Sequence, residues 1–335
     1  MKKIAIIGAG PAGIESASIL ARDNEVLLFE KSATALSNIL DKAFLFPDFT
    51  NATEIADSLN SKLINKNITL MLNKEIVDVV RNDSEWKITD AEGKNYFVDA
   101  VLITTGYQTF DAKRKEELGY GIYKGVVTSL DMERMIRYNQ IVNSMNESPK
   151  RVVFLQCVGS RDEKSGNRYC SKVCCVTAVK QAIEVRKLLP EVETYIFYMD
   201  LRMWGGGFEE MYRESQEKYG VRFVRGRISE AASTYDGKIQ IKSEDTLVGL
   251  PLKMSADLLV LMVGMEPSCG TKELTKQCGC SDTYGFATTV NPHVRDNETA
   301  QPGLFVAGSC KRPMSINDTL NDARSATVKI AEYLR

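Results

Sequence analysis

The sequence predicts an α/β fold of two domains, each built on a strand–helix–strand unit, with the second domain inserted into the first. Residues 3–30 and 150–200 each alternate apolar strand, helix and apolar strand, and residues 303–310 supply one more strand. Alternation of this kind is typical of parallel sheets with helices on their faces. We place the first part of the first domain at 1–112, a connecting segment at 113–149, the inserted Rossmann-like domain at 150–265, and the returning part of the first domain at 266–335.

The composition excludes several classes of protein. The chain has 335 residues, a 44% hydrophobic content and a net charge of -1. Its Lys and Arg residues are scattered, so no surface for nucleic acid is predicted. Apolar runs such as residues 258–265 are far shorter than the roughly 20 residues that span a bilayer. The N-terminus enters a strand directly, without a signal-peptide cleavage region. We therefore expect a cytoplasmic protein whose cysteines stay reduced.

The first predicted element is a βαβ unit with a glycine-rich turn. Ile4–Ile7 is predicted as a strand, residues 8–13 as the turn, and Val26–Phe29 as the second strand, with a helix starting near Pro11. In such a turn the first glycine permits the tight bend, the second admits a pyrophosphate, and the third lets the helix pack on the strands. Glu30 follows the second strand, where a carboxylate accepts hydrogen bonds from ribose hydroxyls. These residues predict a dinucleotide site.

Two later stretches extend the same domain. Residues 100–110 form a predicted strand that runs into Thr105 and Gly106, and residues 303–310 form another that ends at Gly308. Together with the glycine turn they resemble the FAD domain of two-dinucleotide-binding flavoproteins of the glutathione and thioredoxin reductase type. The resemblance implies a discontinuous FAD domain interrupted by an inserted domain that, in those proteins, binds NAD(P)H.

The inserted domain keeps the strand–helix–strand order but has no phosphate-binding turn. Residues 150–156, 171–189 and 192–200 are predicted as strand, helix and strand. A long charged stretch that includes Asp162 and Glu163 separates the first strand from the helix. A pyrophosphate there would meet carboxylates instead of a glycine cradle. We therefore expect that this domain does not bind a pyridine nucleotide.

Four of the eight cysteines occupy that stretch, namely Cys157, Cys170, Cys174 and Cys175. Cys170 and Cys174 are four residues apart, which predicts that they share one face at the N-terminal end of the helix. Cys157 is expected to project from the end of the preceding strand. Spacing alone leaves four alternatives: an iron–sulfur cluster, a zinc site, a redox-active Cys174-Cys175 pair, or cysteines packed as small apolar side chains.

A resemblance to a known family favours the cluster. In the A subunits of the heterodisulfide reductases and their relatives, the same four-cysteine pattern holds a [4Fe-4S] cluster close to an FAD. The resemblance implies that the four cysteines are cluster ligands and that Lys180 is a catalytic cation near the flavin N5. The similar stretches cover most of the chain and comprise residues 39–48, 117–136, 152–182, 195–227 and 303–331.

The same resemblance implies which residues contact FAD. Ser309 stands where most flavoproteins of this architecture carry an aspartate, so the contact to the ribityl chain is expected to differ. The predicted cofactor-binding residues are Gly8, Gly10, Pro11, Ala12, Gly13, Glu30, Lys31, Val77, Thr105, Gly106, Gly308, Ser309, Asp318 and Thr319.

The function implied by the resemblance is that of an oxidoreductase subunit. It passes electrons between FAD, the [4Fe-4S] cluster and iron–sulfur or disulfide-reducing partner subunits, and it forms a homodimer in isolation. The chain lacks the ferredoxin-like cysteine runs of the long methanogen proteins and so resembles the short bacterial forms. Two alternatives stay open: an NAD(P)H-dependent disulfide reductase that uses Cys174-Cys175, and a zinc-stabilised redox sensor. No role is predicted for Cys269, Cys278, Cys280, Cys310 or the single histidine, His293.

Overall fold

A computed structural model describes all 335 residues, which divide into two compact units. The first unit consists of Met1–Leu40, Thr53–Gln108 and Glu266–Arg335, and the second consists of Asp41–Ala52 and Thr109–Met265. The predicted connecting segment 113–149 lies within the second unit, because its strand β11 (Val126–Thr128) pairs with β18 (Leu258–Val263) of that unit's sheet.

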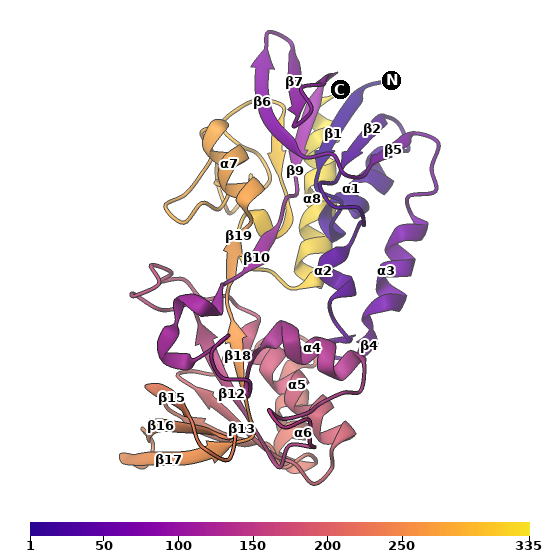
Figure 1. Cartoon of the computed structure of the whole chain (residues 1–335). Helices are drawn as coiled ribbons and strands as arrows, with labels where there is room; N and C mark the ends of the chain where they lie inside the picture. The colour runs from indigo at the N-terminus through magenta and orange to yellow at the C-terminus, as the bar shows by residue number, and fades with distance from the viewer. The chain divides into compact units, whose positions relative to one another are not determined.

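The first unit is built on a five-stranded parallel sheet (Figure 1). The central strands are almost fully buried, which explains why their sequences are continuous apolar runs. Helix α1 (Pro11–Leu20) connects β1 to β2 and packs against α8 (Ile316–Tyr333), the last helix of the chain. The strand order is β20 (Leu304–Val306), β9 (Ala100–Ile103), β1 (Lys3–Ile7), β2 (Glu25–Phe29) and β5 (Ile68–Met71).

The remaining elements of the first unit flank this sheet. They are α2 (Ser37–Leu40), α3 (Ala52–Ser61), α7 (Cys269–Gln277), the short helix η3 (Gly308–Cys310), and an antiparallel sheet of β6 (Ile76–Asn82), β7 (Glu85–Asp90) and β8 (Asn95–Val98). The chain passes between the two units on either side of Asp41–Ala52, and again at β10 (Tyr107–Thr109) and β19 (Met265–Pro267), which pair with each other.

The second unit repeats the parallel arrangement. Its sheet has the order β11, β18, β12 (Arg151–Val158), β13 (Glu193–Tyr198) and β14 (Arg222–Arg225). One face packs against α4 (Ser129–Arg137), α5 (Cys174–Leu188) and α6 (Phe208–Glu217), and the other against an antiparallel sheet of β15 (Glu230–Ser233), β16 (Ile239–Asp245) and β17 (Leu250–Ala256) (Figure 1). Short elements are β3 (Phe44–Leu45), β4 (Thr50–Asn51), η1 (Ala112–Arg114) and η2 (Glu116–Leu118).

Two parallel sheets with helices on their faces confirm the predicted α/β fold. The strands β1, β2, β12 and β13 coincide with the predicted ones to within two residues at each end. None of the helices combines the length and the apolar character that crossing a membrane would require.

Candidate flavin and cysteine sites

The glycine turn after β1 has the shape that a bound dinucleotide needs. Gly8 has a φ of +110°, and a side chain there would place its Cβ 2.6 Å from the carbonyl oxygen of Thr104. At Gly13 a Cβ would lie 1.9 Å from the carbonyl oxygen of Gly8. A Cβ at Gly10, in contrast, would meet no atom within 4 Å. Two glycines are thus required by packing, while the third faces open space that a ligand's phosphates would occupy.

The N-terminus of α1 favours a negative charge. Its N-cap is Gly10, no side chain caps the first turn, and no acidic residue lies in that turn. The unbonded N–H groups and the helix dipole therefore suit a phosphate. Beside the turn, Glu30 is held by two backbone donors: Ala9 N–H donates to Oε2 and Ser32 N–H to Oε1, each at 2.9 Å. The carboxylate keeps further lone pairs for the hydroxyls of a ribose.

The later signatures of the first unit meet this turn. The Thr104 hydroxyl donates to the carbonyl oxygens of Ile7, at 3.0 Å, and Gly8, at 2.8 Å. A Cβ at Gly308 would lie 3.0 Å from the Cβ of Ala12 and 3.2 Å from Cγ2 of Thr319. The three sequence signatures therefore converge as a set that fits a flavin dinucleotide.

The other predicted cofactor residues have the following surroundings. The Thr105 hydroxyl lies 2.7 Å from the Thr271 hydroxyl, and a Cβ added at Gly106 would meet no atom within 4 Å. Asp318 forms a capping box with Ser315 at the start of α8. Ser309 is buried, Lys31 follows Glu30 and is exposed, and Val77 lies on β6 with an exposed side chain. Their contact with a cofactor stays a prediction.

Sequence reasoning missed an ionic group behind Gly308. The carboxylate of Asp322 accepts from the Gly308 N–H at 2.7 Å and pairs with the Lys311 ammonium at 2.7 Å. Lys311 is buried and also pairs with Asp296 at 3.0 Å. No local spacing signals these pairs, because Lys311 lies 11 residues from Asp322 and 15 residues from Asp296 in the sequence. This group fixes the loop that carries Gly308.

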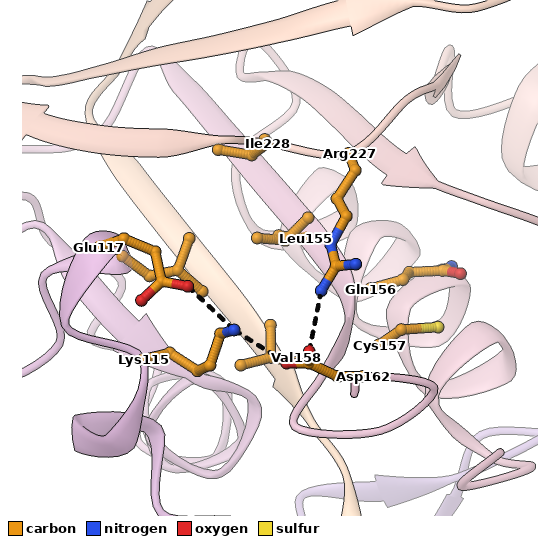
Figure 2. A pocket seen from close by; sticks show the side chains of 10 residues that line it. Lys115, Glu117, Leu155, Gln156, Cys157, Val158, Asp162, Arg227 and Ile228 are labelled. Carbon is orange, nitrogen blue, oxygen red and sulfur yellow. Dashed lines mark hydrogen bonds and ion pairs between the residues drawn. The ribbon is translucent and has the colours of Figure 1, made fainter. Parts of the chain in front are cut away.

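In the second unit a β-bulge positions the first cysteine. The pairing of β12 with β18 shifts register between Leu155 and Val158, and Cys157 has a φ of +60°. An extra residue in one strand breaks the alternation of side chains. Cys157 consequently joins the core on the α5 face of the sheet, while Leu155 and Val158 join the core on the other face. Figure 2 shows Gln156 and Cys157 directed to one side and Leu155 to the other.

Three of the four predicted cysteine ligands lie together. Cys174 and Cys175 are the first two residues of α5, and hydrogen bonds link Cys174 to both Cys157 and Cys175. All three are at most 5% exposed. Cys170 does not lie on α5 as predicted, because α5 begins at Cys174 and not at Ser171. Lys172 has a left-handed φ of 59°, which interrupts a helix, so Cys170 lies in the preceding loop.

Hydrogen bonds and nearby arginines shift the thiol pKa values in opposite directions. The hydrogen bond with Cys174 lowers the pKa of Cys157 to about 7, against the effect of burial and with help from the positive charges of Arg161 and Arg202. The pKa of Cys174 is raised by its hydrogen bonds with Cys157 and Cys175 and by its own burial. The lowered pKa favours the thiolate form of Cys157, whose negative charge Arg161 and Arg202 offset.

The donor set suits an iron–sulfur cluster in its chemistry. Four thiols are the ligands that a [4Fe-4S] cluster takes, and the buried sulfur atoms lie beside Arg161 and Arg202. As the side chains are placed, no group of three or more His, Cys, Asp and Glu residues is arranged to hold a metal ion. By donor type, the residues that would hold a cluster are Cys157, Cys170, Cys174 and Cys175, of which all but the half-buried Cys170 are buried.

A buried ion pair anchors the loop between Cys157 and Cys170. The Lys115 ammonium lies 2.8 Å from Oδ2 of Asp162, and Arg227 approaches Oδ1 at 3.5 Å (Figure 2). These residues line a cavity of about 30 Å³ together with Gln156 and Cys157. Burial acts to raise the pKa of Asp162, but the hydrogen bond and positive charge of Lys115, the Lys164 N–H and the charge of Arg227 together outweigh it and lower the pKa.

Asp162→Asn is expected to destabilise the protein by about 2 kcal/mol, because Lys115 loses its buried partner and keeps only the more exposed Glu117, at 2.9 Å. A carboxyl with a lowered folded-state pKa stabilises the fold at neutral pH and loses this effect as the pH falls through that pKa. The difference between wild type and variant, measured by urea unfolding, should therefore shrink in acid. Lys242→Met, which breaks an exposed pair with Glu230, should cost less than about 1 kcal/mol. Equal costs for both variants would contradict the anchoring role.

Lys180, the predicted catalytic residue, is buried in the second unit. Its ammonium donates to the Phe44 carbonyl oxygen at 2.8 Å and to the Glu133 carboxylate at 2.7 and 2.9 Å. Glu184 lies 3.4 Å away, one helical turn along α5. Sequence reasoning missed both glutamates, although the four-residue spacing of Lys180 and Glu184 was a readable signal. The role of Lys180 toward a flavin stays a prediction.

Glu184 should make the stability pH-dependent. Burial raises its pKa to about 8, with the negative charge of Glu133 adding to the rise and Lys180 opposing it. An unfolded glutamate has a pKa of about 4.3. The folded state therefore binds more protons between these values, and its stability falls as the pH rises toward 8.

Glu184→Gln is expected to remove this dependence, which amounts to about 1.4 kcal/mol per pH unit at most. Urea unfolding at several pH values between 5 and 9 measures it. The exposed Glu147→Gln should keep the wild-type slope. A wild-type stability that does not change over this range would refute the assignment.

Comparisons with known proteins agree with this geometry. Residues 2–142 match the family model described as "Pyridine nucleotide-disulphide oxidoreductase". The chain is 38% identical over 273 residues to the A subunit of the "H(2):CoB-CoM heterodisulfide,ferredoxin reductase" of Methanothermobacter thermautotrophicus, which covers 79% of this chain and 41% of that protein. It is 41% identical over 245 residues to the A subunit of the "H(2)/formate:CoB-CoM heterodisulfide,ferredoxin reductase" of Methanococcus maripaludis, covering 71% and 37%. The chain thus matches about two fifths of the length of these relatives.

Solved structures show the fold. A thioredoxin reductase from Lactococcus lactis superposes with a TM-score of 0.71 at 17% identity, covering 100% of this chain and 99% of that one. The thioredoxin reductase of T. acidophilum gives a TM-score of 0.69 at 17% identity, covering 100% of both chains. Fold, glycine turn and sequence similarity together identify the class of protein. The chain is a flavoprotein similar to the heterodisulfide reductase A subunits, with the fold of the two-dinucleotide-binding flavoproteins.

Proposed function

We propose that the chain carries FAD in its first unit and a [4Fe-4S] cluster in its second, and that it transfers electrons within a heterodisulfide reductase-like complex of sulfur or disulfide metabolism. One observation carries the proposal. The glycine turn of the first unit is open to phosphates at Gly10, whereas a bulge and a cysteine loop stand at the corresponding place between β12 and α5.

The names of related proteins support the cluster and the complex. A protein of Methanopyrus kandleri that is 38% identical over 265 residues has the words "CoB--CoM heterodisulfide reductase iron-sulfur subunit" in its name. We infer from such names that this chain also works with partner subunits that carry iron–sulfur centres or reduce disulfides. We further propose that it forms a homodimer in isolation.

The residues of the first unit would bind and orient the flavin. The α1 N-terminus would hold the pyrophosphate over Gly10, and Glu30 would accept hydrogen bonds from the ribose. A bound flavin exchanges two electrons and a [4Fe-4S] cluster one, so the pair links two-electron and one-electron carriers. The protein's contribution is to position the cofactors and to set their potentials.

The residues of the second unit would hold the cluster and balance its charge. Four cysteine thiolates would be its ligands, and Arg161 and Arg202 would offset their negative charge. Burial of three of these sulfur atoms would exclude water from the cluster. We propose Lys180 as the cation that favours the reduced flavin, with its ammonium oriented by Glu133.

Anaerobic purification tests this function against its two alternatives. We expect flavin absorption bands, a broad shoulder near roughly 400 nm, and about four iron and four acid-labile sulfide per chain. Flavin without iron, together with rapid reduction by NADPH, would instead indicate a disulfide reductase that uses Cys174-Cys175. Zinc without visible colour would indicate a structural site. Either of these two results would overturn the proposal.

A further inference from the structure

The side chain of Gln156 is buried against one of the proposed cysteine ligands. Its amide oxygen has a hydrogen-bond partner, but its amide nitrogen has none. Gln156 lies in the bulge of β12 beside Cys157 and is 5% exposed. The Cys175 thiol donates to its Oε1, with 3.1 Å between Sγ and Oε1. Its Nε2, in contrast, has no hydrogen-bond partner and is shielded from solvent. A buried amide N–H without an acceptor costs about 1–3 kcal/mol, so this arrangement calls for an explanation.

The bulge is what brings Gln156 and Cys157 to the same side. In a regular strand two successive side chains point to opposite faces of the sheet. The register shift between Leu155 and Val158 lets both residues lie on the α5 side, and Figure 2 shows the two side chains directed the same way. Gln156 therefore reaches Cys175 on the helix while Cys157 reaches Cys174. The bulge therefore places the Gln156 amide within hydrogen-bonding distance of a cysteine ligand.

The hydrogen bond to Cys175 must reverse when this sulfur binds iron. A cysteine that ligates a metal has lost its proton, so its sulfur accepts hydrogen bonds and donates none. Rotation of the Gln156 amide by half a turn would place the unpartnered Nε2 at the position of Oε1, about 3 Å from Sγ. The other amide atom then needs one partner, and the cavity of about 30 Å³ that Gln156 lines has room for about two waters.

We propose that Gln156 donates an N–H···S hydrogen bond to the Cys175 ligand and thereby raises the reduction potential of the cluster. Reduction adds negative charge to the cluster and its sulfur ligands, and a donor dipole aimed at a ligand sulfur stabilises the reduced state more than the oxidised state. Gln156 is thus a positioning residue that sets the potential and does not itself exchange electrons. This inference rests on the proposed function.

Gln156→Leu tests the role, because leucine keeps the size of the side chain and removes the donor. We expect unchanged iron content and a lower reduction potential, measured by a redox titration followed by electron paramagnetic resonance. The expected change is about tenfold in the one-electron reduction equilibrium, which corresponds to about 59 mV. Thr194→Val is the matched control, because Thr194 is equally buried in the adjacent strand β13 and its Oγ1 also lacks a partner. Its potential should equal that of the wild type.

A second variant keeps the test decisive if Gln156→Leu loses iron. Gln156→Met keeps the unbranched shape of the side chain and has no N–H donor, so it should lower the potential as much as Gln156→Leu does. Iron-loaded variants with the wild-type potential would overturn the role of Gln156 and leave the proposed function standing. Absence of iron from the wild type would instead overturn the proposed function.

Discussion

Cys157→Ala is expected to abolish iron binding and to leave the flavin in place. Cys157 is the single cysteine contributed by β12, and the bulge that carries it has no other thiol to substitute. Loss of one thiolate leaves three ligands for a centre that takes four. The proposed flavin site lies in the other unit and shares none of these residues. Iron and flavin content of anaerobically purified protein measure both expectations.

Two further variants separate ligand loss from damage to the fold. Cys157 adopts a left-handed φ of +60°, which costs a non-glycine residue roughly 1–2 kcal/mol. Cys157→Gly should relieve this strain, so it should give a protein that unfolds at higher urea concentration than Cys157→Ala and yet contains no iron. Cys269→Ala, at an exposed position in α7 of the first unit, should retain full iron. Iron in either Cys157 variant would refute the ligand assignment.

Gly13→Ala is expected to abolish flavin binding. A Cβ at this position would lie 1.9 Å from the carbonyl oxygen of Gly8 and 3.0 Å from the Thr104 hydroxyl. Backbone atoms cannot yield without moving α1 away from β1, and overpacking of this kind costs about 1–3 kcal/mol. The displaced helix would no longer aim its N-terminus at the pyrophosphate. Flavin content after purification, and recovery of flavin absorbance on adding FAD, measure the loss.

Gly10→Ala distinguishes the approach of the ligand from the packing of the helix. Nothing lies within 4 Å of a Cβ at Gly10, so the variant should fold with wild-type stability. The added methyl group would occupy the space through which the pyrophosphate approaches, and the affinity for FAD should fall at least ~10-fold. Gly206→Ala, also with no atom within 4 Å, should change neither quantity. If Gly10→Ala bound FAD with wild-type affinity, the pyrophosphate would not lie close to Gly10.

Local patterns were enough to predict the repeated framework of the fold. The strands β1 and β2, the start of α1 at Pro11 and the position of Glu30 all follow from apolar runs and glycine spacing within thirty residues. The same holds for β12 and β13. These features depend on neighbours in sequence, which a single chain displays directly.

Features that depend on distant partners could not be predicted. The bulge at Cys157 is defined by the pairing of β12 with β18, and no property of residues 150–156 predicts it. Likewise Lys115 and Asp162 are separated by 47 residues, as are Lys180 and Glu133, so their ion pairs appear only in the folded chain. The four-residue spacing of Cys170 and Cys174 predicts that both lie on the helix. The left-handed φ of Lys172 interrupts the helix between them, so Cys170 lies outside it.

The discontinuity of the first unit has a consequence for synthesis on the ribosome. Strands β1, β2, β5 and β9 emerge early, but β20 and α8, which complete the sheet and pack against α1, follow the whole second unit in the chain. The cysteine-bearing unit is therefore free to fold first, since domains generally fold as they emerge. The proposed flavin site therefore lacks β20 and α8 in the nascent chain until both have left the exit tunnel.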